Sequence, residues 1–217
     1  MTNEQNKTSV TPSPLVQMVW KDFPQHARCL DLGCGKGNDA LFLAQQGFRV
    51  DAIDISADVV QRVRNAAEEK RIAEELNVKQ ADVASHRVPE GTYDVIICRN
   101  VLHFLPKTKA LSVLKNLQHA LKPSGFLIIS VFTEDDPTFS AEKGKKYASY
   151  FERQELLTAF RGWNIIFLYE HRVLDPSHPG APKPHEHGVA RIVAKKLEYS
   201  AHHGDERVVR VVRRENR

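Results

Sequence analysis

Short apolar segments alternate with longer amphipathic segments along residues 28–132. The short segments predict β-strands, because they are rich in Val, Ile and Leu and are followed by turn-forming residues. The predicted strands are RCLDL (28–32), FRVDAIDI (48–55), VKQADV (78–83), YDVIICR (93–99) and GFLIISVF (125–132).

The longer segments carry apolar residues three or four positions apart, which predicts helices. These helices are expected over residues 14–23, 39–47, 57–76, 106–122 and 151–160. Gly47 and Pro123 are residue types that end helices, and they follow two of these segments. The first helix carries Leu15, Val16, Val19 and Trp20, and the pattern fits either core packing or a lid.

Strands that are apolar throughout and alternate with helices predict a parallel sheet covered on both faces. Right-handed crossovers then give a doubly wound α/β fold. Near the end of the chain, WNIIFLYEHRV (163–173) and VARIVAKKL (189–197) predict two more strands, and residues 175–188 between them predict a loop rich in Pro, Gly and His. We therefore expect a mostly parallel, seven-stranded, Rossmann-like sheet that ends in an antiparallel hairpin.

The composition fits one globular domain in a chain of 217 residues, with 41% hydrophobic and 27% charged residues. We expect a disordered leader over residues 1–13, a domain over 14–198 and a basic tail over 199–217. Cys29, Cys34 and Cys98 lack metal-binding spacing, which predicts reduced thiols. The sequence shows no secretion signal and no long apolar run, so we expect a cytoplasmic protein without a membrane partner.

The segment CLDLGCGKGNDALFL (29–43) carries the most informative motif. A G-x-G sequence between a strand and a helix lets a ligand approach the backbone closely. Gly33 and Gly35 fit the dinucleotide fingerprint G-x-G-x-x-G, but Asn38 occupies the third position and Gly37 comes one residue early. Asp31 would repel a pyrophosphate and suits a ligand with a positive end. The loop thus favours S-adenosylmethionine over NAD.

Two further acids follow the next two predicted strands. Asp54 can accept hydrogen bonds from a ribose diol, and Asp82 can accept one from the adenine amine while Val83 packs on the ring. Asp31 and Asp54 could instead merely cap turns and helices, which is a common role of Asp. Because Asp31, Asp54 and Asp82 fall on one edge of the predicted sheet, a shared ligand site explains them better.

These motifs, together with YDVIICRNVLHFL and LKPSGFLIISVF, resemble the ordered motifs of class I S-adenosylmethionine-dependent methyltransferases over residues 14–196. Within that class, GNDALFLAQQGFRVDAIDIS and FERQELLTAFRGWNIIFLYE are most similar to the tellurite-resistance (TehB-like) enzymes. The resemblance implies that the glycine loop lines the methionine portion of the cofactor. The implied cofactor-binding set is Asp31, Gly33, Cys34, Gly35, Gly37, Asp54, Ile55, Asp82, Val83, Arg99 and Asn100.

Two parts of this resemblance leave alternatives open. Arg99 and Asn100 would lie near the methionine carboxylate or the methyl group, but Arg99 could equally form a surface salt bridge. The TehB-like enzymes carry Arg-Asn after the glycine loop, whereas this chain has Asn38 and Asp39. That difference argues against tellurite as the acceptor, and Asn38 itself fits a helix N-cap.

Methyl transfer needs a base only when the acceptor is a neutral amine or hydroxyl. His103 and His187 are the candidate catalytic residues for that step. The HEH sequence would place His185 and His187 on one face of a strand, where they could also bind a metal, although no metal is predicted. We expect the acceptor site between the 15–20 helix, residues 99–104 and the 178–187 loop.

The function expected from the sequence is methyl transfer from S-adenosylmethionine, with S-adenosylhomocysteine as product, to a small soluble acceptor. Candidate acceptors are a chalcogen oxyanion such as tellurite or selenite, a thiol, or a small amine. The alternatives are a non-catalytic S-adenosylmethionine-binding or RNA-associated adaptor and an NAD-dependent oxidoreductase. Nucleic acid is not expected as a partner, and the protein could be a monomer or a homodimer.

Overall fold

A computed structural model describes residues 10–141, 148–176 and 183–198. These residues form a seven-stranded sheet in the order β3-β2-β1-β4-β5-β7-β6. The first five strands pair in parallel, whereas β7 is antiparallel to both β5 and β6. The strand bounds are β1 Arg28–Leu32, β2 Arg49–Asp54, β3 Leu76–Gln80, β4 Tyr93–Arg99, β5 Leu121–Phe132, β6 Asn164–Asp175 and β7 His185–Lys195.

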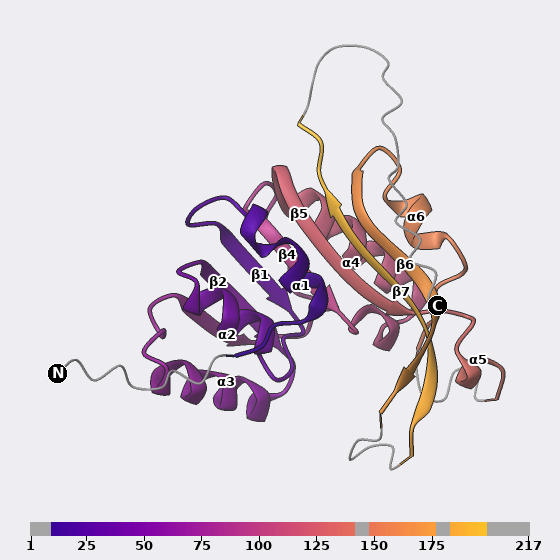
Figure 1. Cartoon of the computed structure of the whole chain (residues 1–217), viewed down its shortest axis with the longest axis horizontal. Helices are drawn as coiled ribbons and strands as arrows, with labels where there is room; N and C mark the ends of the chain where they lie inside the picture. The colour runs from indigo at the N-terminus through magenta and orange to yellow at the C-terminus, as the bar shows by residue number, and fades with distance from the viewer. Residues whose placement is uncertain (1–9, 142–147, 177–182, 199–217) are drawn as a thin grey trace.

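Helices cover both faces of this sheet (Figure 1). One apolar cluster joins the sheet to α1, α2 and α3, and a second joins it to α4 and α6. The helix bounds are α1 Pro14–Val19, α2 Asn38–Gln45, α3 Ala57–Glu69, α4 Lys107–Ala120, α5 Pro137–Ala141 and α6 Glu155–Ala159, with the short 3-10 turns η1 Trp20–Asp22 and η2 Leu102–Phe104. The predicted doubly wound, mostly parallel sheet with an antiparallel hairpin is therefore confirmed.

Several predicted boundaries were wrong, and three of them have a clear physical reason. The helix expected over 57–76 ends at Glu69, because Arg71 takes a left-handed conformation with φ of 57° and Leu76 already belongs to β3. The helix expected over 106–122 ends at Ala120, since Lys122 precedes Pro123 and that position disfavours helix. The loop expected over 175–188 is shorter, because His185–Gly188 belongs to β7.

The first helix packs into the core. Leu15, Val16 and Val19 are buried, and the Ser13 hydroxyl caps the helix by accepting a hydrogen bond from Val16. This packing agrees with the core alternative for the segment.

All three cysteines are free thiols, and Cys29 and Cys98 are buried. Residues 1–9 of the predicted leader and the whole predicted tail lie outside the described residues.

The hairpin formed by β6 and β7 extends past the end of β5 as a twisted ribbon (Figure 1). The last β5 residue, Phe132, pairs with Val189, so the earlier residues of β7 pair with β6 alone. The extension carries His185 and His187 beyond the carboxyl edge of the parallel strands, where ligands of open α/β sheets bind.

Candidate active site

The glycine loop connects β1 to α2 through left-handed backbone. Gly33, Gly35 and Gly37 have φ of 73°, 54° and 75°. The backbone nitrogens of Gly33 and Cys34 both donate to the Ile53 carbonyl, at 2.8 and 2.9 Å. A Cβ at Gly33 would lie 2.3 Å from a Val101 methyl group, whereas a Cβ at Gly35 would meet nothing within 4 Å. Gly33 therefore permits close packing, and Gly35 exposes backbone that a ligand can approach.

Asp54 joins the end of β2 to this loop. Its Oδ2 accepts a hydrogen bond of 3.0 Å from the Gly35 nitrogen, and its Oδ1 accepts one of 3.0 Å from Ser56. Ser56 is the N-cap of α3, so Asp54 does not cap that helix itself. The structure thus places Asp54 against the glycine loop, as a ligand site at this edge requires.

Asp82 and Val83 follow β3 on the same edge. The Asp82 carboxylate accepts a hydrogen bond of 2.8 Å from the Ala84 nitrogen, which is the turn-stabilising contact expected of an Asp in this position. Val83 is buried in the cluster that contains α4, whereas Ile55 is 65% exposed. This bond engages Oδ1 of Asp82 within its own turn, and the predicted adenine contact of Asp82 stays a prediction.

Asp31 is the most strongly perturbed acid in the described residues. Its side chain is buried, and burial, followed by repulsion from Asp39, raises the pKa of Asp31 to about 8. A cationic group nearby would favour the ionised carboxylate and lower this pKa. The position therefore suits a ligand with a positive charge, as inferred from its place before the glycine loop.

A residue outside the predicted set, Asp39, links three segments. Its Oδ2 lies 2.7 Å from an Arg99 terminal nitrogen, and its Oδ1 accepts a hydrogen bond of 2.6 Å from Ser13. The Asp39 side chain is only 5% exposed, so the expected surface salt bridge of Arg99 is an ion pair with a buried partner. The sequence signal for this role is an acid in the first turn of α2, at the position where the chain departs from the TehB-like pattern.

The N-cap prediction for Asn38 was wrong. Gly37 is the N-cap of α2 and Asn38 is the first helical residue, because the left-handed backbone at Gly37 already turns the chain into the helix.

Asn100, just after β4, has left-handed backbone with φ of 56°. Its backbone nitrogen donates a hydrogen bond of 2.8 Å to the Ser130 carbonyl, and its Oδ1 accepts one of 2.8 Å from the Ser130 hydroxyl. Asn tolerates this conformation better than most residues, so the position fixes the turn that follows Arg99.

A second arginine, Arg191 of β7, lies in register with Arg99 across the sheet. Ser130 of β5 pairs with Arg99 on one side and with Arg191 on the other. Burial, followed by repulsion from Arg99, lowers the pKa of Arg191. Sequence analysis missed Arg191, because its relation to Arg99 depends on the register of β7 against β5.

The two candidate catalytic histidines meet at Phe132. Its ring stacks with His103 at 4.1 Å and with His187 at 4.4 Å between centroids. His103 is 1% exposed, and burial together with His187 lowers the pKa of His103 to about 3. Such a weakly basic imidazole suits packing better than proton transfer. His187 is on β7, not in a loop, and the predicted loop residue His178 lies outside the described residues.

Comparison with known proteins agrees with this fold. A profile described as a methyltransferase domain matches residues 5–177, so the chain belongs to the methyltransferase-domain family. The tRNA 5-carboxymethoxyuridine methyltransferase of Escherichia coli K12 is 32% identical over 126 residues, which cover 53% of this chain and 47% of that protein. The resemblance to class I S-adenosylmethionine-dependent methyltransferases is thereby confirmed.

TehB is among the similar proteins by both sequence and structure. The probable S-adenosyl-L-methionine-dependent methyltransferase TehB of Haemophilus influenzae strain 10810 is 28% identical over 142 residues, covering 64% of this chain and 46% of that protein. The crystal structure of TehB from Haemophilus influenzae superposes with a TM-score of 0.73 at 20% identity, covering 89% of this chain and 65% of that one. The chain spans about half the length of the curated relatives it matches. Among the described residues, no helix combines the length and apolar character needed to cross a membrane.

Proposed function

We propose that this protein transfers a methyl group from S-adenosylmethionine to a small soluble acceptor. The observation that carries the proposal is the contact between Asp54 and the Gly35 nitrogen, in a loop whose Gly35 has open space beside it. This contact supports the proposal because it puts the acid that would bind the ribose beside backbone that a ligand can approach. Membership of the methyltransferase-domain family supports the same cofactor.

The cofactor would lie along the carboxyl edge of β1, β2 and β3. Gly33, Cys34, Gly35 and Gly37 would line its methionine portion, and Asp54 with Ile55 would bind the ribose. Asp82 and Val83 would hold the adenine, while the buried Asp31 would favour the positive end of the ligand.

Arg99 is suited to the methionine carboxylate. Its Nε is buried and has no hydrogen-bond partner in the described part of the chain, although its Nη1 pairs with Asp39. A buried donor of this kind is costly unless a ligand satisfies it. Asn100, held by Ser130, fixes the backbone beside this contact.

The chain's own residues would act mainly by positioning. When bound, S-adenosylmethionine supplies an activated methyl group on a sulfonium. The protein then has to hold the acceptor atom in line with that carbon and exclude water. Arg191 favours an anionic acceptor, such as a chalcogen oxyanion or a thiolate, which attacks without losing a proton. For a neutral amine, His103 and His187 are the predicted bases, although the low pKa of His103 argues against its taking a proton.

A transfer assay with methyl-labelled S-adenosylmethionine tests this proposal. Tellurite, selenite, a small thiol, a small amine and bulk tRNA would be offered separately as acceptors. We expect label in at least one small acceptor, and loss of transfer in Asp54→Ala. Asp58→Ala is the matched control, because Asp58 is exposed in the first turn of α3 and should leave transfer unchanged. Label in tRNA alone would contradict the small acceptor, and no label with any acceptor would count against the activity itself.

A further inference from the structure

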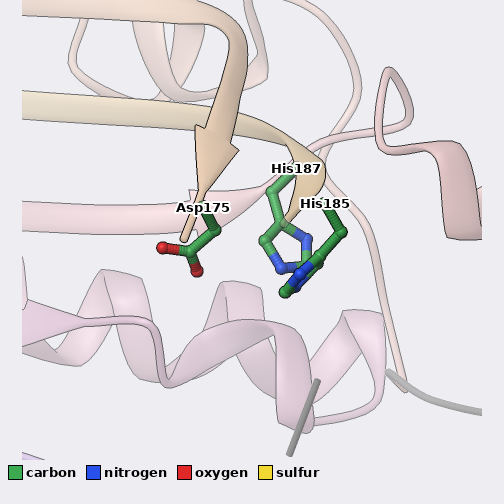
Figure 2. Close-up of side chains that lie close together, drawn as sticks. All are labelled: Asp175, His185 and His187. Carbon is green, nitrogen blue, oxygen red and sulfur yellow. The ribbon is translucent and has the colours of Figure 1, made fainter. Parts of the chain in front are cut away.

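Three possible metal ligands come together where the β6–β7 hairpin extends past β5. Asp175 pairs directly with His185, and His187 lies two residues further along β7. Paired residues of antiparallel strands share a face, as do residues two apart on one strand. All three side chains therefore project to the same side, as Figure 2 shows, and their ligand atoms lie within 4.8 Å of one another.

We propose that Asp175, His185 and His187 bind a divalent transition-metal ion such as zinc. Two imidazoles with one carboxylate are a donor set for zinc, iron or cobalt, whereas magnesium and calcium prefer oxygen ligands alone. In a tetrahedral site with metal–ligand distances of about 2.1 Å, the ligand atoms are about 3.4 Å apart. Side-chain rotations at the end of a hairpin can bring the three atoms to that spacing.

The hydrogen bonds behind the cluster orient both histidine rings for this role. Nδ1 of His187 lies 2.7 Å from Oδ2 of Asp136, and Nδ1 of His185 lies 3.2 Å from the Lys183 carbonyl. Histidines that bind metals commonly donate their other ring nitrogen to a carboxylate or a backbone carbonyl in this way. When Nδ1 carries the proton, Nε2 of each ring carries the lone pair that would bind the ion.

Asp136 is well placed to hold His187. Its carboxylate is fully buried, and its Oδ1 also accepts hydrogen bonds from the Thr138 nitrogen and hydroxyl. These bonds hold the Asp136 carboxylate in place, so that its Oδ2 faces Nδ1 of His187 and can accept the proton of that nitrogen in a hydrogen bond.

The register of the hairpin selects Asp175 over the acid nearest in sequence. Glu186 stands between the two histidines in the chain, but it pairs with Leu174 and therefore projects from the opposite face. Its carboxylate lies 3.7 Å from Arg172, and both side chains are about half exposed. No metal was predicted from the sequence, because only the pairing of β6 with β7 brings Asp175 beside the histidines.

A metal at this site changes the part assigned to His187. An Nε2 that binds an ion has no lone pair with which to take a proton. A metal-bound His187 therefore cannot act as the general base. Three protein ligands leave at least one coordination position for a donor atom from solvent or an acceptor. The inference does not rest on methyl transfer, because metal binding is measured directly.

The test is a titration of the full-length protein with zinc by calorimetry, after treatment with a chelator. Cobalt in a parallel titration reports coordination through its visible absorption bands. We expect one tight equivalent in the wild type. Removal of a residue that only hydrogen-bonds to a metal-bound histidine weakens metal binding about 10- to 100-fold. Asp175→Asn and His185→Gln remove ligands themselves, so each should weaken zinc binding by about 100-fold or more. Asp175 and His185 are partly exposed, so the fold should persist.

Glu186→Gln is the matched control, since it alters the neighbouring carboxylate on the other face and should leave zinc affinity unchanged. S-adenosylhomocysteine binding in each variant shows separately whether the cofactor site is intact. The proposal is overturned if the double variant Asp175→Asn/His185→Gln binds zinc as tightly as the wild type, as histidines elsewhere in the sequence would allow. It is equally overturned if Glu186→Gln weakens zinc binding as much as Asp175→Asn does.

Discussion

The two halves of the sheet's carboxyl edge each bury an acid, but the surroundings of the two acids shift their pKa values in opposite directions. In the cofactor half, formed by β1, β2, β3 and the glycine loop, Asp31 is buried near other acids and its pKa is raised to about 8. In the hairpin half, formed by η2, the end of β5 and the β6–β7 hairpin, Asp136 is paired with His187 and has a lowered pKa. The raised pKa of Asp31 suits a site that a positively charged ligand completes, whereas the charge of Asp136 already has its partner in His187.

The halves also differ in how their residues are brought together. The glycine loop and Asp54 are joined by one crossover from β1 to β2, so a short stretch of sequence contains them. His103, Phe132, Asp136 and His187 meet only after β4, β5, β6 and β7 have paired in register.

The largest effect should be the pH dependence caused by Asp31. The folded state keeps the Asp31 proton up to pH about 8 and the unfolded state loses it above about 4, so the free energy of unfolding falls as pH rises between these values. The shift from 3.8 to about 8 corresponds to at most about 6 kcal/mol. Asp31→Asn should remove this loss, as urea unfolding at pH 5 and pH 8 would show. If wild type and Asp31→Asn lose stability equally between pH 5 and pH 8, the raised pKa is wrong.

Two variants of the glycine loop should differ in stability, because Gly33 permits close packing whereas Gly35 leaves space for a ligand. Gly33→Ala combines left-handed backbone with a clash against Val101, for an expected loss of about 3 kcal/mol in the free energy of unfolding. Gly35→Ala has left-handed backbone but no clash, so we expect about 1 kcal/mol. Both should abolish S-adenosylhomocysteine binding. Thermal unfolding and calorimetry would measure the two effects, and equal losses of stability would contradict the assigned roles.

Removing the Asp39–Arg99 ion pair should lower the free energy of unfolding by less than Gly33→Ala does. Asp39→Asn leaves Arg99 without its anionic partner, and removing one member of a buried pair costs about 3–5 kcal/mol. Arg99 is about one-third exposed, so we expect a smaller loss of about 2 kcal/mol, because solvent screens the remaining charge. Denaturant unfolding would measure it. Asp58→Ala, at the exposed start of α3, serves as the control, and an Asp39→Asn as stable as Asp58→Ala would contradict the structural role of the pair.

The smallest effect should come from the exposed pair on the hairpin. Arg172 and Glu186 are 3.7 Å apart and both are more than half exposed, so Glu186→Gln should change the free energy of unfolding by less than about 0.5 kcal/mol. Raising the salt concentration should remove even this difference. A loss above about 1 kcal/mol would mean that the hairpin extension depends on exposed charge, contrary to the contrast with buried Asp136.

The sequence predicted the cofactor half better than the hairpin half, for physical reasons. Strand ends, glycine turns and acids are local signals, so Gly33, Gly35 and Asp54 were placed correctly at one edge. Asp39 was missed because its partners Arg99 and Ser13 lie on other segments. Arg191 and Asp175 were missed because strand register determines their neighbours, and a single sequence does not specify which residues pair across β5, β6 and β7.

The same reasoning explains the boundary errors. The segment 57–76 keeps helical spacing past Glu69, yet the left-handed Arg71 ends the helix so that Leu76 can pair with Val50. Residues 185–188 contain polar residues and a glycine, which favour a loop locally, but pairing with β6 makes them a strand. Tertiary pairing thus overrides local propensity at both places.

The most direct test of the account is calorimetric titration of the wild type and Asp54→Ala with S-adenosylmethionine, S-adenosylhomocysteine and NADH. The account predicts binding of the first two ligands and none of NADH. Asp54→Ala should bind them about 10- to 100-fold more weakly, since hydrogen bonds to a charged group contribute about 1.5–3 kcal/mol. Binding of NADH, binding of none of the three, or an Asp54→Ala variant that binds as tightly as the wild type would contradict the cofactor site at this edge of the sheet.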